Sequence, residues 1–366
     1  MNTMFPEVKG RFGFGCMRLP MAGEEVDLDH FAAMTDRFLA GGFNYFDTAH
    51  GYISEKSETA IRACLTSRHP RESYILTDKL SGNYFETQAD IRPLFERQLA
   101  ACGVEYFDFY LLHAMSASRY GQYTDCRAFQ IVQELKAEGK IRHVGMSFHD
   151  TADVLDRILT DHPELEVVQL QFNYLDFDDP RVQSRACYEV CVKHNKPVIV
   201  MEPVKGGKLA DLPPAARAEL EPLGGLSPAG AALRFCASFP NVCMILSGMG
   251  SMDMMEDNLS AMSIPGPLGE EEMAAVFRAR DVLAAQKAIP CTGCRYCVDG
   301  CPASIPIPEL FACVNDRAQG RAVSYQAAVE GRGRASQCVK CGKCEEICPQ
   351  HLEIRSLLAR TAQIFE

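Results

Sequence analysis

Short apolar runs alternate with amphipathic stretches over the first 290 residues of the chain. Eight of these runs are rich in β-branched and aromatic residues and have the length of one buried strand. They are Phe12–Cys16, Asn44–Ala49, Tyr74–Lys79, Asp108–His113, His143–Phe148, Val167–Phe172, Pro197–Glu202 and Val242–Ser247. Between them, apolar residues recur at the helical period, for example in Leu28–Ala40, Phe129–Ala137, Thr151–Leu159 and Arg181–His194.

This alternation predicts an α/β fold with a parallel sheet. Eight near-continuous apolar strands, each followed by a helix, are typical of a (β/α)8 TIM barrel, which needs about 250 residues. The alternative is an open, doubly wound sheet, which would place Gly-x-Gly-x-x-Gly after its first strand and open a helix there. The first run reads Phe-Gly-Phe-Gly-Cys and opens no helix, so we expect the barrel.

Length and composition set the class of protein. The chain has 366 residues, of which 47% are hydrophobic and 23% charged, values that exclude general disorder. It contains no run of twenty apolar residues, and its net charge of −11 argues against a nucleic-acid partner. Residues 1–11 lack the basic and apolar layout of a signal peptide. We therefore expect a cytoplasmic protein that binds neither membrane nor nucleic acid.

The cysteines divide the chain unevenly. Of 17 cysteines, nine fall in the last 76 residues. The other eight are scattered singly and are expected to be small core residues. A helical pattern over Glu270–Gln286 precedes the change, so we expect a barrel domain at 1–288 and a second domain at 289–366. The second domain is predicted to be small and mostly helical, with helices at Ile307–Arg317 and Ser324–Glu330.

Two motifs in this second domain follow the pattern Cys-x2-Cys-x2-Cys-x3-Cys-Pro. This is the spacing of bacterial-type ferredoxin clusters, in which the fourth cysteine of each run ligates the other cluster. The first predicted [4Fe–4S] cluster uses Cys291, Cys294, Cys297 and Cys348. The second predicted cluster uses Cys338, Cys341, Cys344 and Cys301. Zinc is the alternative, but a zinc site needs only four ligands and would leave cysteines idle in both motifs.

Polar residues end most of the predicted barrel strands. In a barrel of this type such residues face the active-site mouth. They are Asp47, Lys79, His113, Ser147, Gln169, Glu202 and Ser247, with Tyr52 just beyond the second strand. An Asp, a Lys, a His and a Tyr at one mouth form a proton-transfer set, in which the lysine charge is expected to lower the tyrosine pKa.

Four of these residues resemble the catalytic tetrad of the aldo-keto reductases. Asp47 and Tyr52 stand in Phe-Asp-Thr-Ala-His-Gly-Tyr, Lys79 ends Ile-Leu-Thr-Asp-Lys, and His113 ends Tyr-Leu-Leu-His. The similarity covers about residues 10–262. The resemblance implies carbonyl reduction by hydride from a nicotinamide cofactor, with Tyr52 as general acid and His113 orienting the carbonyl. Asp47 and Lys79 would tune Tyr52.

The resemblance also assigns contacts to the nicotinamide end of the cofactor. Ser147 and Gln169 match residues that touch the carboxamide, and Asn173 falls in the same Gln-x-x-x-Asn segment. Met201 stands where the family has an aromatic ring stacked on the nicotinamide, and Phe148 replaces the usual Asn.

A second segment matches the family's pyrophosphate and adenosine contacts. Its residues are Ser247, Gly248, Met249, Gly250, Ser251 and Asn258. Gly250 stands where a basic residue usually holds the 2′-phosphate of NADP. The expected cofactors are therefore NADH or NADPH together with two [4Fe–4S] clusters.

Three hypotheses remain for how the clusters relate to the barrel. In the first, the protein interconverts a small-molecule carbonyl and an alcohol, and the clusters are structural or sense redox state. In the second, the clusters pass electrons to or from the barrel site through a flavin or a redox partner protein. In the third, the barrel is a catalytically silent regulatory module, against which the intact tetrad argues. The substrate itself depends on the mouth loops, chiefly Ala114–Asp125 and Met17–Val26.

Overall fold

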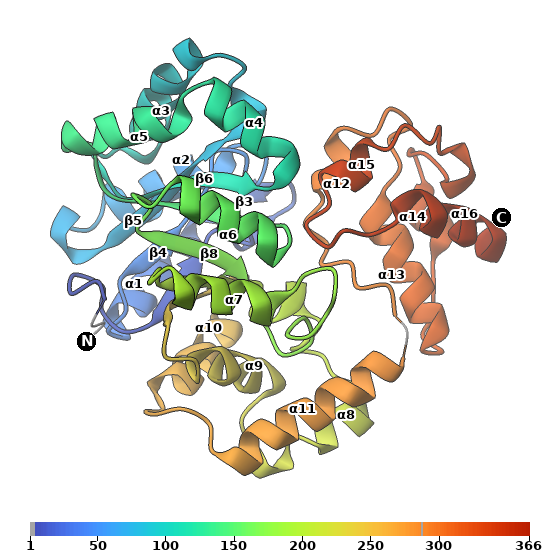
Figure 1. Cartoon of the computed structure of the whole chain (residues 1–366). Coiled ribbons are helices and arrows are strands. Elements are labelled where there is room, and N and C mark those ends of the chain that lie inside the picture. The colour runs from blue at the N-terminus through green and yellow to red at the C-terminus, as the bar shows by residue number, and fades with distance from the viewer. Residues whose placement is uncertain (1–3, 287) are drawn as a thin grey trace.

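A computed structural model describes residues 4–286 and 288–366, and its core is a closed barrel of eight parallel strands (Figure 1). The strands are β1 (Phe12–Gly15), β4 (Tyr45–Asp47), β5 (Ile75–Ser81), β6 (Phe107–Met115), β7 (Ile141–Phe148), β8 (Val167–Gln171), β9 (Val198–Met201) and β10 (Val242–Ser247). The barrel closes between β1 and β10, where Phe14 is in register with Ser247. The predicted TIM barrel and its eight strands are confirmed.

Helices cover the outside of the barrel. They are α1 (Leu28–Ala40), α2 (Lys56–Ile61), α3 (Gln88–Cys102), α4 (Ala117–Asp125), α5 (Ala128–Ala137), α6 (Ala152–Asp161), α7 (Ser184–Lys193), α8 (Pro214–Ala218), α9 (Pro228–Ala237), α10 (Met252–Ser263) and α11 (Glu270–Ala285). The four amphipathic stretches predicted from the sequence correspond to α1, α5, α6 and α7. A short hairpin of β2 (Met21–Ala22) and β3 (Glu25–Val26) lies in the loop after β1.

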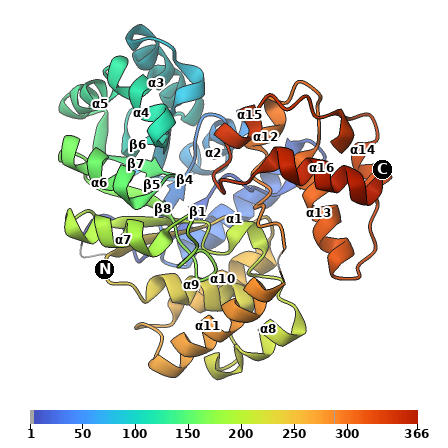
Figure 2. The same ribbon diagram turned by 45° about the vertical axis from the view of Figure 1, so that its right-hand side comes forward.

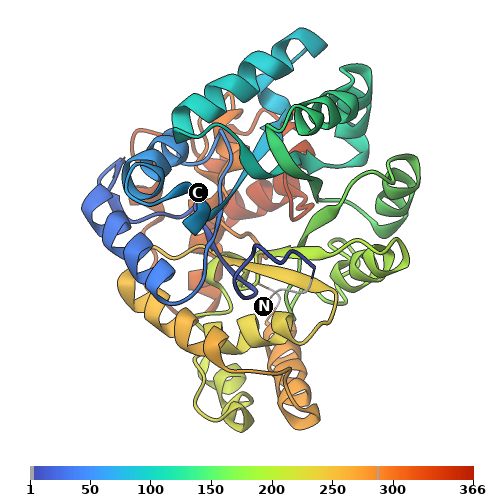
Figure 3. The same cartoon turned by 90° about the vertical axis from the view of Figure 1, so that its left-hand side faces the viewer.

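The N-terminal segment lies across the end of the barrel opposite the C-terminal segment (Figure 3). Phe5 and Val8 join an apolar cluster with inward side chains of the strands, including Phe109. The rings of Phe5 and Phe109 lie 4.9 Å apart in an edge-to-face arrangement. The eight scattered cysteines of the barrel are all buried, as predicted.

The C-terminal segment follows α11 and packs beside the barrel mouth (Figures 1 and 2). Its helices are α12 (Tyr296–Asp299), α13 (Ile307–Ala318), α14 (Tyr325–Val329), α15 (Lys343–Glu346) and α16 (Ile354–Phe365). Buried residues of this segment, among them Leu310, Phe311 and Leu358, form an apolar cluster separate from that of the barrel. Both views place α12 and α15 on the side that faces the barrel. None of the helices in the described residues is long and apolar enough to cross a membrane.

Candidate active site

A buried ion pair lies at the C-terminal ends of strands β4 and β5. Lys79 Nζ donates 2.6 Å hydrogen bonds to Asp47 Oδ1 and to the backbone oxygen of Thr48. The other carboxylate oxygen, Asp47 Oδ2, accepts a 3.2 Å hydrogen bond from Gln169 Nε2. Lys79 and Asp47 are both buried. Because each buried charge is paired and hydrogen-bonded, the arrangement avoids the cost of an isolated charge in the core.

Tyr52 lies next to this pair, in the loop after β4. The Nζ atom of Lys79 is 4.9 Å from the centroid of the Tyr52 ring. Burial raises the pKa of Tyr52 well above its ordinary value, the negative charge of Asp47 raises it further, and Arg18 opposes the rise. The pKa of Tyr52 is therefore raised, whereas the sequence analysis predicted that it would be lowered. A tyrosine with a raised pKa stays protonated and can donate a proton.

His113 faces Tyr52 across the barrel mouth. Their ring centroids lie 6.0 Å apart at an interplanar angle of 78°. Burial lowers the pKa of His113 well below its ordinary value, and the charge of Lys79 lowers it further, so the ring is neutral. Its Nδ1 atom lies 2.6 Å from Ser81 Oγ. If that hydroxyl is the donor, the imidazole proton lies on Nε2 and can be donated to a carbonyl oxygen.

A cavity of about 620 Å³ extends from Tyr52 and His113 to the loop between β10 and α10. Six of the ten predicted cofactor residues line it: Gln169, Met201, Ser247, Gly248, Gly250 and Asn258. Asn258 Nδ2 donates a 2.9 Å hydrogen bond to Ser247 Oγ, which fixes both side chains on this wall.

The other four predicted cofactor residues are not among those lining the cavity in the described chain. Ser147 Oγ accepts a hydrogen bond from the Ala114 backbone, and Ser251 caps the N-terminus of α10. Met249 is fully buried. Asn173 Oδ1 accepts hydrogen bonds from the backbone N–H groups of Leu175 and Asp176. Asn173 Nδ2 donates hydrogen bonds to the Asp176 carboxylate and to the backbone oxygen of Glu202. In the described structure these four side chains contact neighbouring residues of the barrel and not the cavity.

The charges of this cavity fit a nicotinamide dinucleotide. Arg18 is the one Lys or Arg among the described lining residues; its side chain lies against Gly248 and pairs with Glu202 at 3.4 Å. A cation there can bind a diphosphate. Two carboxylates, those of Asp253 and Asp257, line the far end, where they would oppose an additional phosphate. Arg18 was not found from the sequence, because its loop carries no cofactor motif.

The cysteines of the C-terminal segment form two groups. Burial raises the pKa of Cys297, and the thiols of Cys294, Cys291 and Cys348, followed by that of Cys344, raise it further, so all four thiols lie near Cys297. A second group lines one small cavity, and its cysteines are Cys301, Cys338, Cys341 and Cys344. The second group thus combines three cysteines of the second motif with Cys301, the last cysteine of the first motif.

Within residues 4–286 and 288–366, no three His, Cys, Asp or Glu side chains converge on a position for one metal ion. Thiolates that bind separate iron atoms of a cluster need to surround a larger volume. Cys313 lies in α13, outside both groups.

The cluster loops form part of the barrel cavity. Cys294, Tyr296, Pro349 and Gln350 line the cavity that contains Tyr52. The sequence did not single out Tyr296 or Gln350, although each lies within two residues of a predicted ligand. Motif spacing locates the cysteines but not the direction in which the intervening residues point.

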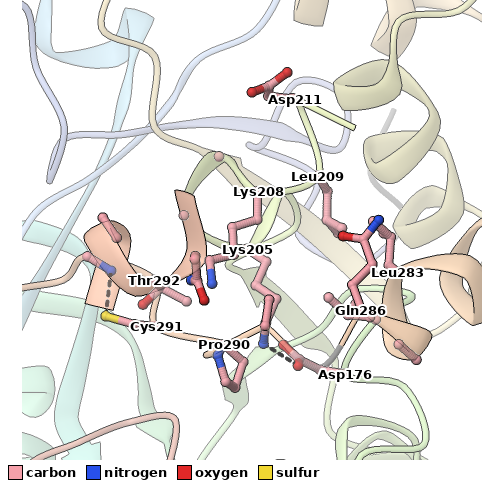
Figure 4. Close-up of a pocket in the computed structure, with 18 of the residues that line it drawn as sticks. Asp176, Lys205, Lys208, Leu209, Asp211, Leu283, Gln286, Pro290, Cys291 and Thr292 are labelled. Carbon is pink, nitrogen blue, oxygen red and sulfur yellow. Dashed lines mark hydrogen bonds and ion pairs between the residues drawn. The ribbon is translucent and has the colours of Figure 1, made fainter. Parts of the chain in front are cut away.

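A buried polar network joins the second cluster loop to the barrel. Gln350 and Gln171 exchange two hydrogen bonds, of 2.7 and 3.1 Å, and the Gln171 amide also donates to Asp176. Lys205 Nζ pairs with Asp176 and donates a 2.9 Å hydrogen bond to Gln350 Oε1. Figure 4 shows this Lys205–Asp176 pair.

The first cluster loop contacts the turn after β9. Gly206 has a φ of +63°, and a Cβ atom at this position would collide with the backbone oxygen of Thr292, between Cys291 and Cys294. Arg18 Nη2 donates to the same oxygen at 3.1 Å. A cavity of about 830 Å³ lies on the outer side of this contact, lined by Lys208 and Cys291 (Figure 4).

Comparisons with known proteins match two successive parts of the chain. A family model described as "Aldo/keto reductase family" matches residues 11–281, and one described as "4Fe-4S dicluster domain" matches residues 290–352. The NADH-specific methylglyoxal reductase of Escherichia coli (strain K12) is 26% identical over 186 residues, which cover 46% of this chain and about half (54%) of that relative. The uncharacterized oxidoreductase C215.11c of Schizosaccharomyces pombe is 28% identical over 272 residues, 70% of this chain and 83% of that protein.

Solved structures resemble the barrel part. The holo form of aldo-keto reductase AKR11C1 from Bacillus halodurans superposes with a TM-score of 0.60 at 25% identity, covering 74% of this chain and 91% of that one. An aldo-keto reductase from Klebsiella pneumoniae in complex with NADPH has the same TM-score at 20% identity, covering 74% and 95% of the two chains.

Proposed function

Because the chain belongs to the aldo/keto reductase family and carries a 4Fe-4S dicluster domain after its barrel, we propose that it interconverts a carbonyl and an alcohol with NADH or NADPH. The observation that carries the proposal is the position of Tyr52. It adjoins the buried Lys79–Asp47 pair on one side and the neutral His113 on the other. This is an arrangement for protonating a carbonyl oxygen.

In the proposed reaction a nicotinamide cofactor, when bound, would supply the hydride for the carbonyl carbon. Tyr52 donates its phenolic proton to the carbonyl oxygen, and the raised pKa keeps that proton in place until the oxygen becomes basic. His113 donates a hydrogen bond to the same oxygen from Nε2. Lys79, held by Asp47, stabilises the phenolate left on Tyr52. Proton uptake from water restores the acid.

The proposed dinucleotide site is the 620 Å³ cavity, with Arg18 near the diphosphate. We favour NADH over NADPH because Gly250 supplies no cation and both Asp253 and Asp257 face this end of the cavity. The name of the E. coli relative, an NADH-specific reductase, supports the same preference.

We assign residues 1–288 to the reductase domain and residues 289–366 to the cluster domain. In this proposal Cys291, Cys294, Cys297 and Cys348 hold the [4Fe–4S] cluster nearer the barrel. Cys338, Cys341, Cys344 and Cys301 hold the second. The clusters would hold together the loops that cover the barrel mouth. They would serve as a structural or redox-sensing element.

A second candidate function is supported by the position of Cys294, which lines the same cavity as Tyr52. A cluster held by Cys294 would lie at the wall of the cavity that contains Tyr52, and electron exchange with a bound nicotinamide would take place there. Hydride transfer moves two electrons together and a cluster moves one, so this function would also require a flavin or a redox partner protein.

An anaerobic titration of cluster-replete protein with NADH, and then NADPH, separates the two functions. Cofactor binding with unchanged visible absorbance, together with turnover of a carbonyl substrate, supports the reductase. Bleaching of the cluster absorbance without a carbonyl substrate supports electron exchange. If no carbonyl or alcohol is turned over with either nucleotide, the reductase proposal is wrong.

A further inference from the structure

A second cavity adjoins the first at the barrel mouth. It has a volume of about 390 Å³ and lies between the barrel loops after β5 and β6 and the cluster loop around Cys348. Five residues line both cavities: Tyr52, His113, His149, Tyr296 and Pro349. The two residues proposed to act on the carbonyl therefore lie where the dinucleotide cavity meets this chamber.

Tyr296 is the side chain that the C-terminal segment places at this junction. It begins α12, between Cys294 and Cys297, and lines both cavities beside Tyr52. Its hydroxyl has no hydrogen-bond partner among the described residues. A phenol at the wall of an active-site chamber, with no protein partner, is free to bind a ligand.

The cluster loops hold Tyr296 in a defined position. The first loop is fixed by the contact of Thr292 with Gly206 and by the hydrogen bond from Arg18. The second loop is fixed by Gln350 in its buried network. A side chain carried on an anchored loop needs less rearrangement of its backbone when a ligand binds, which favours specific recognition.

The charges of the chamber favour an uncharged ligand. Arg119 is its one Lys or Arg in the described chain and already donates to Asn83 Oδ1 at 3.1 Å. Carboxylates are more numerous: Asp150, Asp299, Glu345 and Glu346 line the chamber, and of these Glu345 is paired with Arg355. Ser116 and Ser118 add hydroxyl groups. A small, neutral, hydroxylated carbonyl compound fits this lining better than an anionic one.

We propose that Tyr296 binds the carbonyl substrate in this chamber, so that the cluster segment completes the substrate site of the barrel. The inference rests on the proposed reductase function. It assigns a substrate-binding residue to the iron–sulfur segment. It also predicts that the substrate site, unlike most of the dinucleotide site, depends on the cluster loop being folded.

The test compares Tyr296→Phe with the wild-type protein. Glycolaldehyde and propanal serve as matched hydroxylated and unsubstituted probes. Loss of one neutral hydrogen bond should raise KM for glycolaldehyde by about 3- to 10-fold. The same variant should change KM for propanal, the affinity for NADH and the iron content by less than about 2-fold. Tyr296→His, which keeps a ring donor, should recover part of the loss.

Tyr325→Phe is the control, because it makes the same change within the C-terminal segment. Tyr325 bonds Glu366 and the Ala335 backbone and lines neither cavity. It should leave KM for both aldehydes unchanged. A wild-type KM for glycolaldehyde in Tyr296→Phe overturns the inference.

A binding measurement keeps the inference separate from the reductase proposal. In the Tyr52→Phe background, saturation-transfer NMR should detect glycolaldehyde, and adding Tyr296→Phe should weaken that signal. Equal signals in the two variants would contradict the role of Tyr296. Absence of wild-type turnover, with the Tyr296-dependent signal present, would contradict only the reductase proposal.

Discussion

Gln350 Nε2 donates a 2.7 Å hydrogen bond to Oε1 of Gln171, which ties the residue two positions beyond Cys348 to the end of strand β8. The two residues are 179 positions apart in the chain and both are buried. Gln350 Oε1 also accepts from Lys205, the buried cation of the network. The loop that carries Cys348 is thus part of the barrel's polar core.

Gln350→Ala should loosen the C-terminal segment from the barrel. The change removes one hydrogen bond from Lys205 and two from Gln171 in a buried site, and each group left unsatisfied costs about 1–3 kcal/mol. We expect faster proteolysis between α11 and the cluster segment and a lower thermal midpoint. Gln319→Ala, at an exposed site that ends α13, should leave both unchanged. A Gln350→Ala protein as resistant as the wild type would show that the network does not hold the segment.

Tyr52→Phe should abolish turnover while the protein stays folded. Removing a positioned general acid lowers kcat by about 10²- to 10⁴-fold. Because the ring remains beside Lys79, the affinity for NADH should stay within about 2-fold of the wild-type value. Steady-state kinetics and nucleotide binding measure the two effects. Tyr106→Phe, near Arg142 at the opposite end of the barrel, is the control and should keep full activity. Retention of kcat in Tyr52→Phe would exclude this residue as the acid.

The barrel and the tetrad could be predicted because both depend on local patterns. Each strand is a short apolar run, and its last polar residue must face the mouth once the barrel closes. Asp47, Lys79 and His113 follow from that rule alone. The cysteine groups follow from motif spacing in the same way.

The rest of the site depends on contacts between distant segments. Tyr296 reaches the cavity only because its loop docks on the turn after β9, and no local pattern encodes that docking. Arg18 gains its place from the same contact. The pKa of Tyr52 was predicted in the wrong direction because burial and the charge of Asp47 raise it more than the charge of Arg18 lowers it, and burial is known only from the fold.

Cys297→Ser should lose about half of the iron, since one of two clusters loses a thiolate ligand. In the proposed assignment each cluster takes three cysteines from one motif and the last cysteine from the other, so double variants give a sharper test. Cys297→Ser combined with Cys348→Ser should lose no more iron than either change alone, whereas Cys297→Ser combined with Cys301→Ser should lose nearly all of it. Iron and sulfide analysis with visible absorbance measures this. Cys313→Ser should keep its full iron content. Equal losses in both double variants would reject the grouping.

Glu166→Gln should flatten the acid limb of the stability curve. Although burial raises the pKa of Glu166, hydrogen bonds from His143, Lys136 and the Val144 backbone lower it more, to about 2 from an ordinary 4.5. A carboxylate with a depressed pKa stabilises the fold above pH 4.5, and that contribution is lost as the pH falls toward 2. Because Glu166 is partly exposed, we expect an effect on the order of 1 kcal/mol.

Urea unfolding at several pH values between about 2 and 7 measures the Glu166 effect. His143 is protonated over the acid limb, so its charge does not change there. Glu189→Gln, on helix α7, is the control and should follow the wild-type curve. A Glu166→Gln protein that loses stability below pH 4.5 as steeply as the wild type would contradict the prediction.

Gly250→Lys should shift nucleotide preference toward NADPH. A Cβ atom on Gly250 would meet only the Arg18 backbone oxygen, at 3.8 Å, and the backbone there is not in the left-handed region, so a side chain can be accommodated. The new cation would offset the carboxylates of Asp253 and Asp257 at the end of the cavity where a 2′-phosphate would lie. We expect the ratio of the Kd for NADPH to the Kd for NADH to fall by about 10-fold.

Gly250→Ala adds the side-chain carbon without the charge and should leave the ratio unchanged. If Gly250→Ala and Gly250→Lys shift the ratio equally, the space at residue 250 and not its charge governs the preference. If neither variant shifts it, the adenosine end of the dinucleotide does not lie at this loop.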